Sequence, residues 1–290
     1  MALFAKTTAL QRCRVALPLL ALAGCGTLQN DINVPLPTYS AELVVECYLE
    51  PGQVPSLAVT TSVPYLATAL PQVPNDVVVA LILPNGTRVP LSFAPNYRAL
   101  VDTTGEKFHS HIGRDLLVAR PGDVFGLDVR DSQGRRATAT TTMLAPVPID
   151  SMEYKFNDKP VVADRRAYML TNFRDPAPLD NCYRLLLHKG NPARGALRKQ
   201  PETDISLEDR LVNGRPVTVG TSYRFYLGDT VTATLYHTDR AFYRFQRSVR
   251  DARGANGNPF GQPSAIYGNV QGGIGIFSVL SSARATKILR

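Results

Sequence analysis

The segment VVVALILPNGTRVPLSF, residues 77–93, decides the fold class. It contains two apolar or alternating runs, residues 77–83 and 87–93, separated by a turn with Asn85 and Gly86. Asn-Gly between two such runs is a strong signal for a β-hairpin, because both residues tolerate the positive φ that tight hairpin turns require. The segment therefore predicts two antiparallel strands.

Segments of the same kind recur before the sequence Pro146-Val147-Pro148, each bounded by Gly, Pro, Asn or Asp. They predict a first strand that starts near Glu42 and further strands at residues 57–61, 77–83, 87–93, 124–130 and 135–143. Short strands with frequent turns and no helical periodicity favour a mainly β fold. We expect residues 41–145 to form an immunoglobulin-like β-sandwich.

Pro146 and Pro148 disfavour both a helix and a central strand, and we place a domain boundary there. Residues 149–290 are expected to form a second β-rich domain, with strands at residues 151–156, 167–173, 182–189, 216–225 and 230–237. A long polar stretch, residues 190–214, interrupts these strands. We interpret it as either a binding element or a disordered loop.

One segment, TDRAFYRFQRSVR at residues 238–250, predicts an amphipathic helix that Thr238 or Asp239 can cap. Three apolar residues share one of its faces: Phe242, Phe245 and Val249. Three arginines share the opposite face: Arg240, Arg244 and Arg247. The apolar face should pack on the second sheet. The arginine face is either solvated surface or a contact for an anionic ligand, a lipid headgroup or a partner.

Residues 1–24 have the pattern of a bacterial lipoprotein signal peptide. They contain three basic residues, no acidic residue, and an apolar run at residues 15–23 that is too short to span a bilayer. The run ends in LAGC, residues 22–25, which predicts cleavage between Gly24 and Cys25. An ordinary secretory signal or a buried N-terminal helix are the alternatives.

Lipidation of Cys25 would leave two or three acyl chains on the new N-terminus, and two or more chains are enough for a stable membrane anchor. Residues 25–40 contain few large apolar side chains and two prolines, which favours an extended tether. The formal net charge of +8 falls by three when the signal is removed. Without a clustered basic face or a recognisable module, nucleic acid is not an expected partner.

Cys47 and Cys182 are the cysteines that remain for the folded part, since Cys13 lies in the signal. They could form a disulfide in an exported protein, or stay as two separate buried thiols. His109 and His111 lie at a spacing that can chelate a metal. We favour exposed histidines of a turn or edge strand, because no cysteine or carboxylate stands at ligand spacing beside them.

Motifs for nucleophilic, zinc-dependent or nucleotide-dependent catalysis are missing from the sequence, so we expect no cofactor and name no catalytic residue. Acidic residues are scattered, which leaves a hydrolase with an unidentified carboxylate pair as an alternative. Near the C-terminus, Gly273 and Gly275 alternate with Ile274 and Ile276. In a strand they would give one bare face where another backbone can approach closely.

A series of short motifs follows in order along the chain: LAGC at 22–25, LVVE at 43–46, PIDS at 148–151, FRDP at 173–176, NCYR at 181–184, GDTV at 228–231, NPF at 258–260 and GGIGIF at 272–277. Together they resemble the Bacteroidota lipoprotein family catalogued as domain of unknown function 4249. The resemblance covers nearly the whole chain after Cys25. It implies an outer-membrane lipoprotein, often encoded beside a TonB-dependent receptor, and carries over no catalytic residue.

These observations favour a non-enzymatic lipoprotein of the outer membrane, at the cell surface or on the periplasmic face, that assists TonB-dependent nutrient uptake. It would bind a ligand or the receptor itself. The candidate contacts are residues 190–214, the loop with Asn258, Pro259 and Phe260, and the arginines of the predicted helix. An envelope structural or adhesive module is the alternative, followed by an anchored hydrolase.

Overall fold

The computed structural model describes residues 39–64, 72–101, 107–177, 180–190, 192, 200–255 and 265–290. Contacts within the chain separate Met1–Ser40 from Ala41–Arg290, and the elements below belong to the second unit. The described part is mainly β, as predicted.

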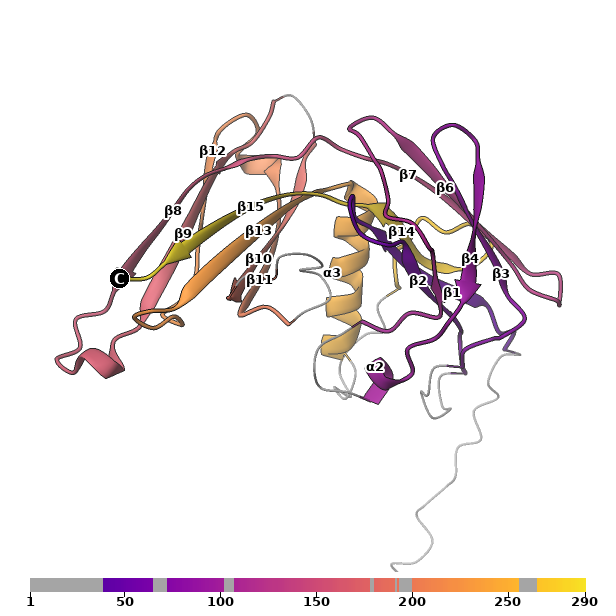
Figure 1. Cartoon of the computed structure of the whole chain (residues 1–290), viewed down its shortest axis with the longest axis horizontal. Helices are drawn as coiled ribbons and strands as arrows, with labels where there is room; N and C mark the ends of the chain where they lie inside the picture. The colour runs from indigo at the N-terminus through magenta and orange to yellow at the C-terminus, as the bar shows by residue number, and fades with distance from the viewer. Residues whose placement is uncertain are drawn as a thin grey trace, which may run out of the picture. The chain divides into compact units, whose positions relative to one another are not determined.

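The strands, labelled as in Figure 1, are β1 Leu43–Leu49, β2 Ser56–Thr61, β3 Val78–Ile82, β4 Arg88–Phe93, β5 His111–Ile112, β6 Val124–Arg130, β7 Arg136–Thr142, β8 Ile149–Phe156, β9 Ala167–Arg174, β10 Cys182–Lys189, β11 Thr203–Glu208, β12 Pro216–Gly220, β13 Thr230–Thr238, β14 Ile274–Val279 and β15 Ser281–Ile288. The α-helices are α2 Arg98–Val101 and α3 Arg240–Ala255, and the 3-10 helices are η1 Val162–Asp164 and η3 Asp209–Leu211.

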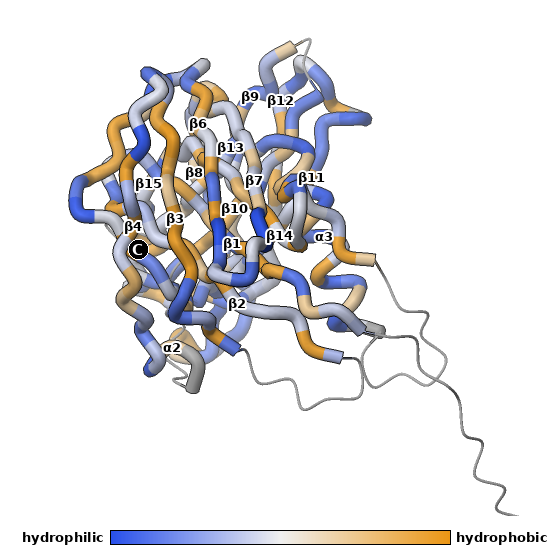
Figure 2. The backbone as a smooth tube through the Cα atoms, turned by 90° about the vertical axis from the view of Figure 1, so that its right-hand side faces the viewer, coloured by the Kyte–Doolittle hydropathy of each residue, from blue (hydrophilic) through white to orange (hydrophobic). Residues whose placement is uncertain are grey.

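The first sheet has eight strands in the order β14-β1-β2-β5-β4-β3-β6-β7. The predicted hairpin is confirmed, since β3 pairs antiparallel with β4 and places Leu81 opposite Val89. Alternate residues of these strands fill one apolar core, and β3 is apolar along most of its length (Figure 2).

The two edges of this sheet come together. The backbone N–H of Thr138 donates to the carbonyl of Gln271 over 2.9 Å, and Gln271 N–H donates back over 2.8 Å. Val279 N–H at the end of β14 donates to Thr141 Oγ1 of β7 over 3.2 Å. The sheet is therefore barrel-like, and the immunoglobulin-like sandwich expected for residues 41–145 is not confirmed.

Strand β14 comes from the far end of the chain and pairs parallel with β1, with Gly275 opposite Val45. Gly275 has φ of +128°, and a Cβ added there would lie 1.9 Å from the carbonyl oxygen of Val45. The bare glycine face predicted from the sequence is thus occupied by the backbone of β1. As a result, the first sheet takes strands from both sides of the boundary placed at residues 146–148.

Two smaller sheets follow, a four-stranded one in the order β11-β10-β13-β15 and a three-stranded one in the order β12-β9-β8. Their apolar faces share a second core, which includes Phe173, Tyr183 and Phe225. Strand β11 lies inside residues 190–214, so the disordered-loop alternative is wrong for Thr203–Glu208, whereas the binding-element alternative stays a prediction. These residues pair antiparallel with β10 and form the edge of the sheet.

Helix α3 confirms the helix predicted from the sequence. Asp239 Oδ1 accepts a hydrogen bond from the backbone N–H of Phe242 over 2.6 Å, as expected for a residue that caps a helix. Phe242 and Phe245 are buried in a third apolar cluster with residues of β10, β13 and β14. Because β14 belongs to the first sheet and β10 to the second, α3 packs between them (Figure 1).

Candidate functional site

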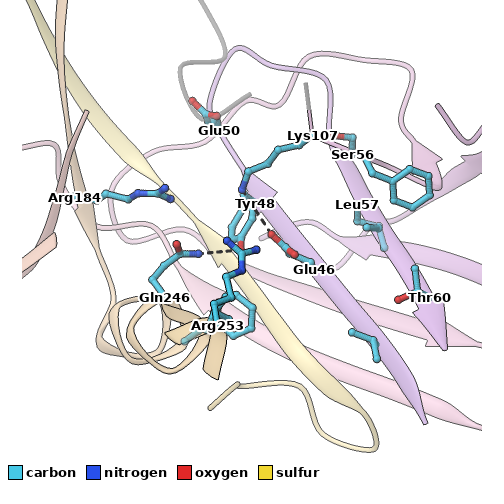
Figure 3. Close-up of a pocket in the computed structure, with 15 residues that line it drawn as sticks. Glu46, Tyr48, Glu50, Ser56, Leu57, Thr60, Lys107, Arg184, Gln246 and Arg253 are labelled. Atoms are coloured by element: carbon cyan, nitrogen blue, oxygen red, sulfur yellow. Dashed lines mark hydrogen bonds and ion pairs between the residues drawn. The ribbon is translucent and has the colours of Figure 1, made fainter. Parts of the chain in front are cut away.

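An open pocket with a volume of about 460 Å³ lies between the outer face of β1 and β2, residues Lys107 and Phe108, strand β10 and helix α3 (Figure 3). The alternation of buried and partly exposed side chains along β1 explains which residues form the wall of the pocket. Leu43, Val45 and Cys47 point into the first core, so the residues between them face the opposite side. That side presents Glu46 and Tyr48 to the pocket.

Tyr48 lies at the centre of the pocket and is held by three neighbours. Its hydroxyl accepts a hydrogen bond from Gln246 Nε2 over 3.2 Å, and its ring forms a T-shaped contact with the Phe242 ring, with 5.4 Å between the centroids. Lys107 Nζ lies 4.2 Å from the ring centroid. Burial raises the pKa of Tyr48 well above its ordinary value, and the charge of Glu46 adds to this rise.

Lys107 also approaches Glu46, with 3.6 Å between Nζ and Oε1. Burial lowers the pKa of Lys107, whereas the negative charge of Glu46 opposes that change. The repulsion from the guanidinium of Arg184 lowers it further. Both cations line the pocket.

Arg184 reaches the pocket from β10, and Asp204 of β11 fixes its orientation. Nε of Arg184 donates to Asp204 Oδ1 over 2.9 Å, and Nη2 donates to Oδ2 over 2.8 Å. The Arg184 side chain is only 12% exposed. Its third nitrogen, Nη1, is buried and has no hydrogen-bond partner among the described residues.

Two further charges line the pocket. Glu50 Oε2 accepts a hydrogen bond from the hydroxyl of Tyr236 over 3.1 Å. Arg253 is exposed near the end of α3. Neither histidine nor cysteine occurs among the residues that line this pocket, so no activated nucleophile of the Ser-His or Cys-His type is formed by them. The arrangement offers hydrogen bonds, charge and apolar surface, which are the requirements for binding.

The helix arginines predicted as contacts are exposed, as the sequence indicated, and none of them lines the pocket. Arg240 pairs with Asp180 at 3.0 Å. Arg244 lies over the ring of Tyr267, 5.1 Å from its centroid, and Arg247 approaches a neighbour on the same helix. The pocket instead uses the opposite face of α3.

The other sequence-predicted contacts, Asn258, Pro259 and Phe260, lie outside the described residues, as do Gly24 and Cys25. Among the described residues of 190–214, strand β11 contributes to the pocket indirectly, because its Asp204 binds Arg184. The alternation of Ile205 and Leu207 with polar residues was the signal in the sequence that could have revealed this strand.

His111 is buried at 1% exposure, rather than exposed, because β5 lies between β2 and β4 inside the first sheet. Its Nδ1 is 2.9 Å from Ser110 Oγ, and its Nε2 is 3.2 Å from the carbonyl oxygen of Val77. Burial lowers the pKa of His111. No group of three metal-ligating side chains occurs in the part of the chain that the structure describes.

Cys47 and Cys182 are separate, buried free thiols, which is the second of the two alternatives drawn from the sequence. Cys47 lies in the first core, and burial raises its pKa far above the usual range. Burial likewise raises the pKa of Cys182 to about 12. Both groups therefore stay protonated at neutral pH.

The sequence motifs FRDP and NCYR meet in a buried polar network. Asp175 accepts hydrogen bonds from the Tyr183 hydroxyl, from Asn181 Nδ2 over 3.1 Å and from the backbone N–H of Gly214 over 2.7 Å. Asn181 Oδ1 in turn lies 2.9 Å from Nε2 of His237. These motif residues join the second core to neighbouring turns, and Arg184, the last residue of NCYR, enters the pocket.

In a comparison with protein families, the family described as Domain of unknown function (DUF4249) matches residues 29–286. The chain belongs to this family. The matched region contains every strand described above except the last residues of β15, together with the pocket. The family description names no activity, and no curated protein matches the chain. Across the residues described, no helix combines the length and the apolar character needed to cross a bilayer.

Proposed function

We propose that this member of the family is a lipid-anchored protein of a Bacteroidota outer membrane that binds a small ligand as an accessory of TonB-dependent nutrient uptake. Cys25 carries the anchor, residues 25–40 act as the tether, and the β-rich unit presents the pocket. The single observation that carries the binding role is the open pocket that joins β1, β10 and α3, with the paired and oriented side chains of its wall.

The pairing of these side chains favours binding over catalysis. Gln246 holds the hydroxyl of Tyr48, and Asp204 holds two nitrogens of Arg184. A preformed wall of this kind suits a ligand site, because little side-chain freedom is lost when the ligand arrives. Its volume of about 460 Å³ also fits a small organic molecule.

The anchor and the uptake role are tested together in the native host. The gene is deleted and replaced by the wild type or by Cys25→Ala, and uptake is measured with a panel of labelled nutrients. We expect the wild type to be acylated, to fractionate with the outer membrane and to restore uptake of at least one nutrient. Cys25→Ala should be unacylated, leave the membrane fraction and fail to restore uptake.

The opposite results would refute the proposal. A Cys25→Ala protein that stays in the membrane fraction would show that lipidation of Cys25 is not what anchors the protein. Deletion that leaves uptake of every nutrient intact, but changes cell attachment or envelope integrity, would favour the structural or adhesive module instead.

A further inference from the structure

Arg184 is an arginine with two nitrogens committed to a protein carboxylate and a third left for something else. Asp204 accepts from Nε and Nη2, which leaves both protons of Nη1 without an acceptor among the described residues. A buried donor without a partner is costly, and a charged donor costs more than a neutral one. Arg184 lines the pocket, so a ligand atom beside its guanidinium can supply the missing acceptor once the groups that cover Nη1 shift.

The surroundings of Arg184 favour an acceptor that carries negative charge. The Phe242 ring centroid lies 6.0 Å from Cζ of Arg184, and the Arg184 side chain is 12% exposed, so water screens its charge weakly. Lys107 and Arg184 reach toward the same space above Tyr48 (Figure 3). An oxyanion placed there would accept charge-assisted hydrogen bonds from Arg184 and reduce the repulsion between the two cations.

The rest of the pocket limits the ligand. Glu46 and Glu50 also line it, and they disfavour a molecule with several negative charges. Phe245 and Val249 of α3, together with Ala58 of β2, provide apolar surface beside the charged end. The lining therefore suits a small molecule with one anionic end and an apolar body.

We infer that the pocket binds a small organic anion whose carboxylate or phosphate group is received by Nη1 of Arg184, with Lys107 beside it. This inference rests on the proposed binding function and names the class of ligand. Carboxylate and phosphate share the chemistry that a guanidinium recognises, so the probes separate the two sources.

The test uses the full acylated chain in nanodiscs and isothermal titration with three probes of similar shape: benzoate, phenyl phosphate and the neutral benzyl alcohol. We expect at least one of the two anions to bind and benzyl alcohol to bind at least about tenfold more weakly. Arg184→Gln should weaken the bound anion about tenfold or more. Arg250→Gln, which removes the same charge from an exposed site on α3 outside the pocket, should leave affinity unchanged.

A second variant tests the same site in case Arg184→Gln fails to fold. Ala58 faces the pocket from β2 and belongs to none of the three apolar clusters, so Ala58→Leu narrows the pocket without removing a charge. It should also weaken the anion, with an unchanged circular dichroism spectrum. Equal binding of benzyl alcohol, equal effects of the Arg184 and Arg250 variants, or no binding of either anion up to about 10 mM would overturn the inference.

Anion binding and the role in uptake can be tested independently of each other. Anion binding by a protein whose deletion leaves uptake intact would keep the site and reject the uptake role. Loss of uptake on deletion, with no anion binding, would keep the uptake role and reject the site.

Discussion

At the residue scale, Asp128 of β6 is a buried carboxylate surrounded by three arginines, one on its own strand and two on other strands of the first sheet. It lies 2.6 Å from Arg88 Nη2, 2.9 Å from Arg130 Nη2 and 3.0 Å from Arg136 Nε, and it is 2% exposed. Hydrogen bonds from these arginines, that of Arg130 first, hold the pKa of Asp128 well below its ordinary value. The cluster joins β4, β6 and β7.

Asp128→Asn should lower the free energy of unfolding by about 1–3 kcal/mol at pH 7, because half-exposed arginines keep their solvation while the buried acceptor loses its charge. A lowered pKa means that the stabilisation is present above about pH 4 and is lost as the pH falls below it. Urea unfolding measures both effects. Asp115→Asn, at an exposed position, is the control, and equal unfolding free energies for the two variants would contradict the role of the cluster.

His111 should also make the stability of the protein fall at low pH. Here the cause is that a buried neutral base gains a charge, whereas Asp128 loses one. Its lowered pKa means that the folded protein binds this proton less readily than the unfolded chain, whose histidine titrates near pH 6.5. The stability contributed by neutral His111 should therefore decline below about pH 6.5, by up to about 1.4 kcal/mol per pH unit.

The comparison of His111→Gln with the wild type isolates this contribution, since other titrating groups are common to both. The difference between their free energies of unfolding should shrink from pH 7.5 to pH 5. A difference for His111→Gln that stays constant over this range would show that the residue does not titrate as proposed.

At the scale of elements, the contact of β14 with β1 depends on a glycine. Gly275→Ala should destabilise the protein by at least about 2 kcal/mol, because alanine disfavours φ of +128° and its Cβ would overlap the carbonyl of Val45. Gly254→Ala on α3 is the matched control, since a Cβ there meets nothing within 4 Å and alanine favours a helix. Thermal unfolding of both variants measures the difference. If Gly275→Ala proves no less stable than Gly254→Ala, the close contact of β14 with β1 does not depend on this glycine.

Elements with a local signal could be predicted from the sequence. The hairpin at Asn85-Gly86 follows from its turn, and α3 follows from the spacing of Phe242, Phe245 and Val249. Strand β11 was missed because most of its residues are partly exposed and its alternation is short. The parallel pairing of β14 with β1 could not be predicted, because it joins residues from opposite ends of the chain.

The pocket could not be predicted from the sequence, because it too is formed by segments that lie far apart along the chain. Alternation along β1 places Glu46 and Tyr48 away from the core, and this could be read from the sequence. Which side chains meet them there depends on how α3 and β10 pack against the first sheet. Arg184 and Gln246 reach the pocket from segments with no local pattern that connects them.

At the scale of the whole molecule, the proposal joins an acylated N-terminus to a β-rich unit with a ligand pocket. The matched family covers that unit but begins after Cys25, so the anchor and the partner require their own measurement. Residues 25–40 would give the unit freedom to meet a partner embedded in the same membrane.

Purification of the full-length chain, tagged at its C-terminus, from outer membranes of the native host in mild detergent is the most direct test. Mass spectrometry would identify the co-purified proteins and the N-terminal residue. We predict an acylated Cys25 as the N-terminus and a TonB-dependent receptor in near-stoichiometric amount. A chain that keeps residues 1–24, or an acylated chain that is recovered without a receptor, would contradict the proposed function.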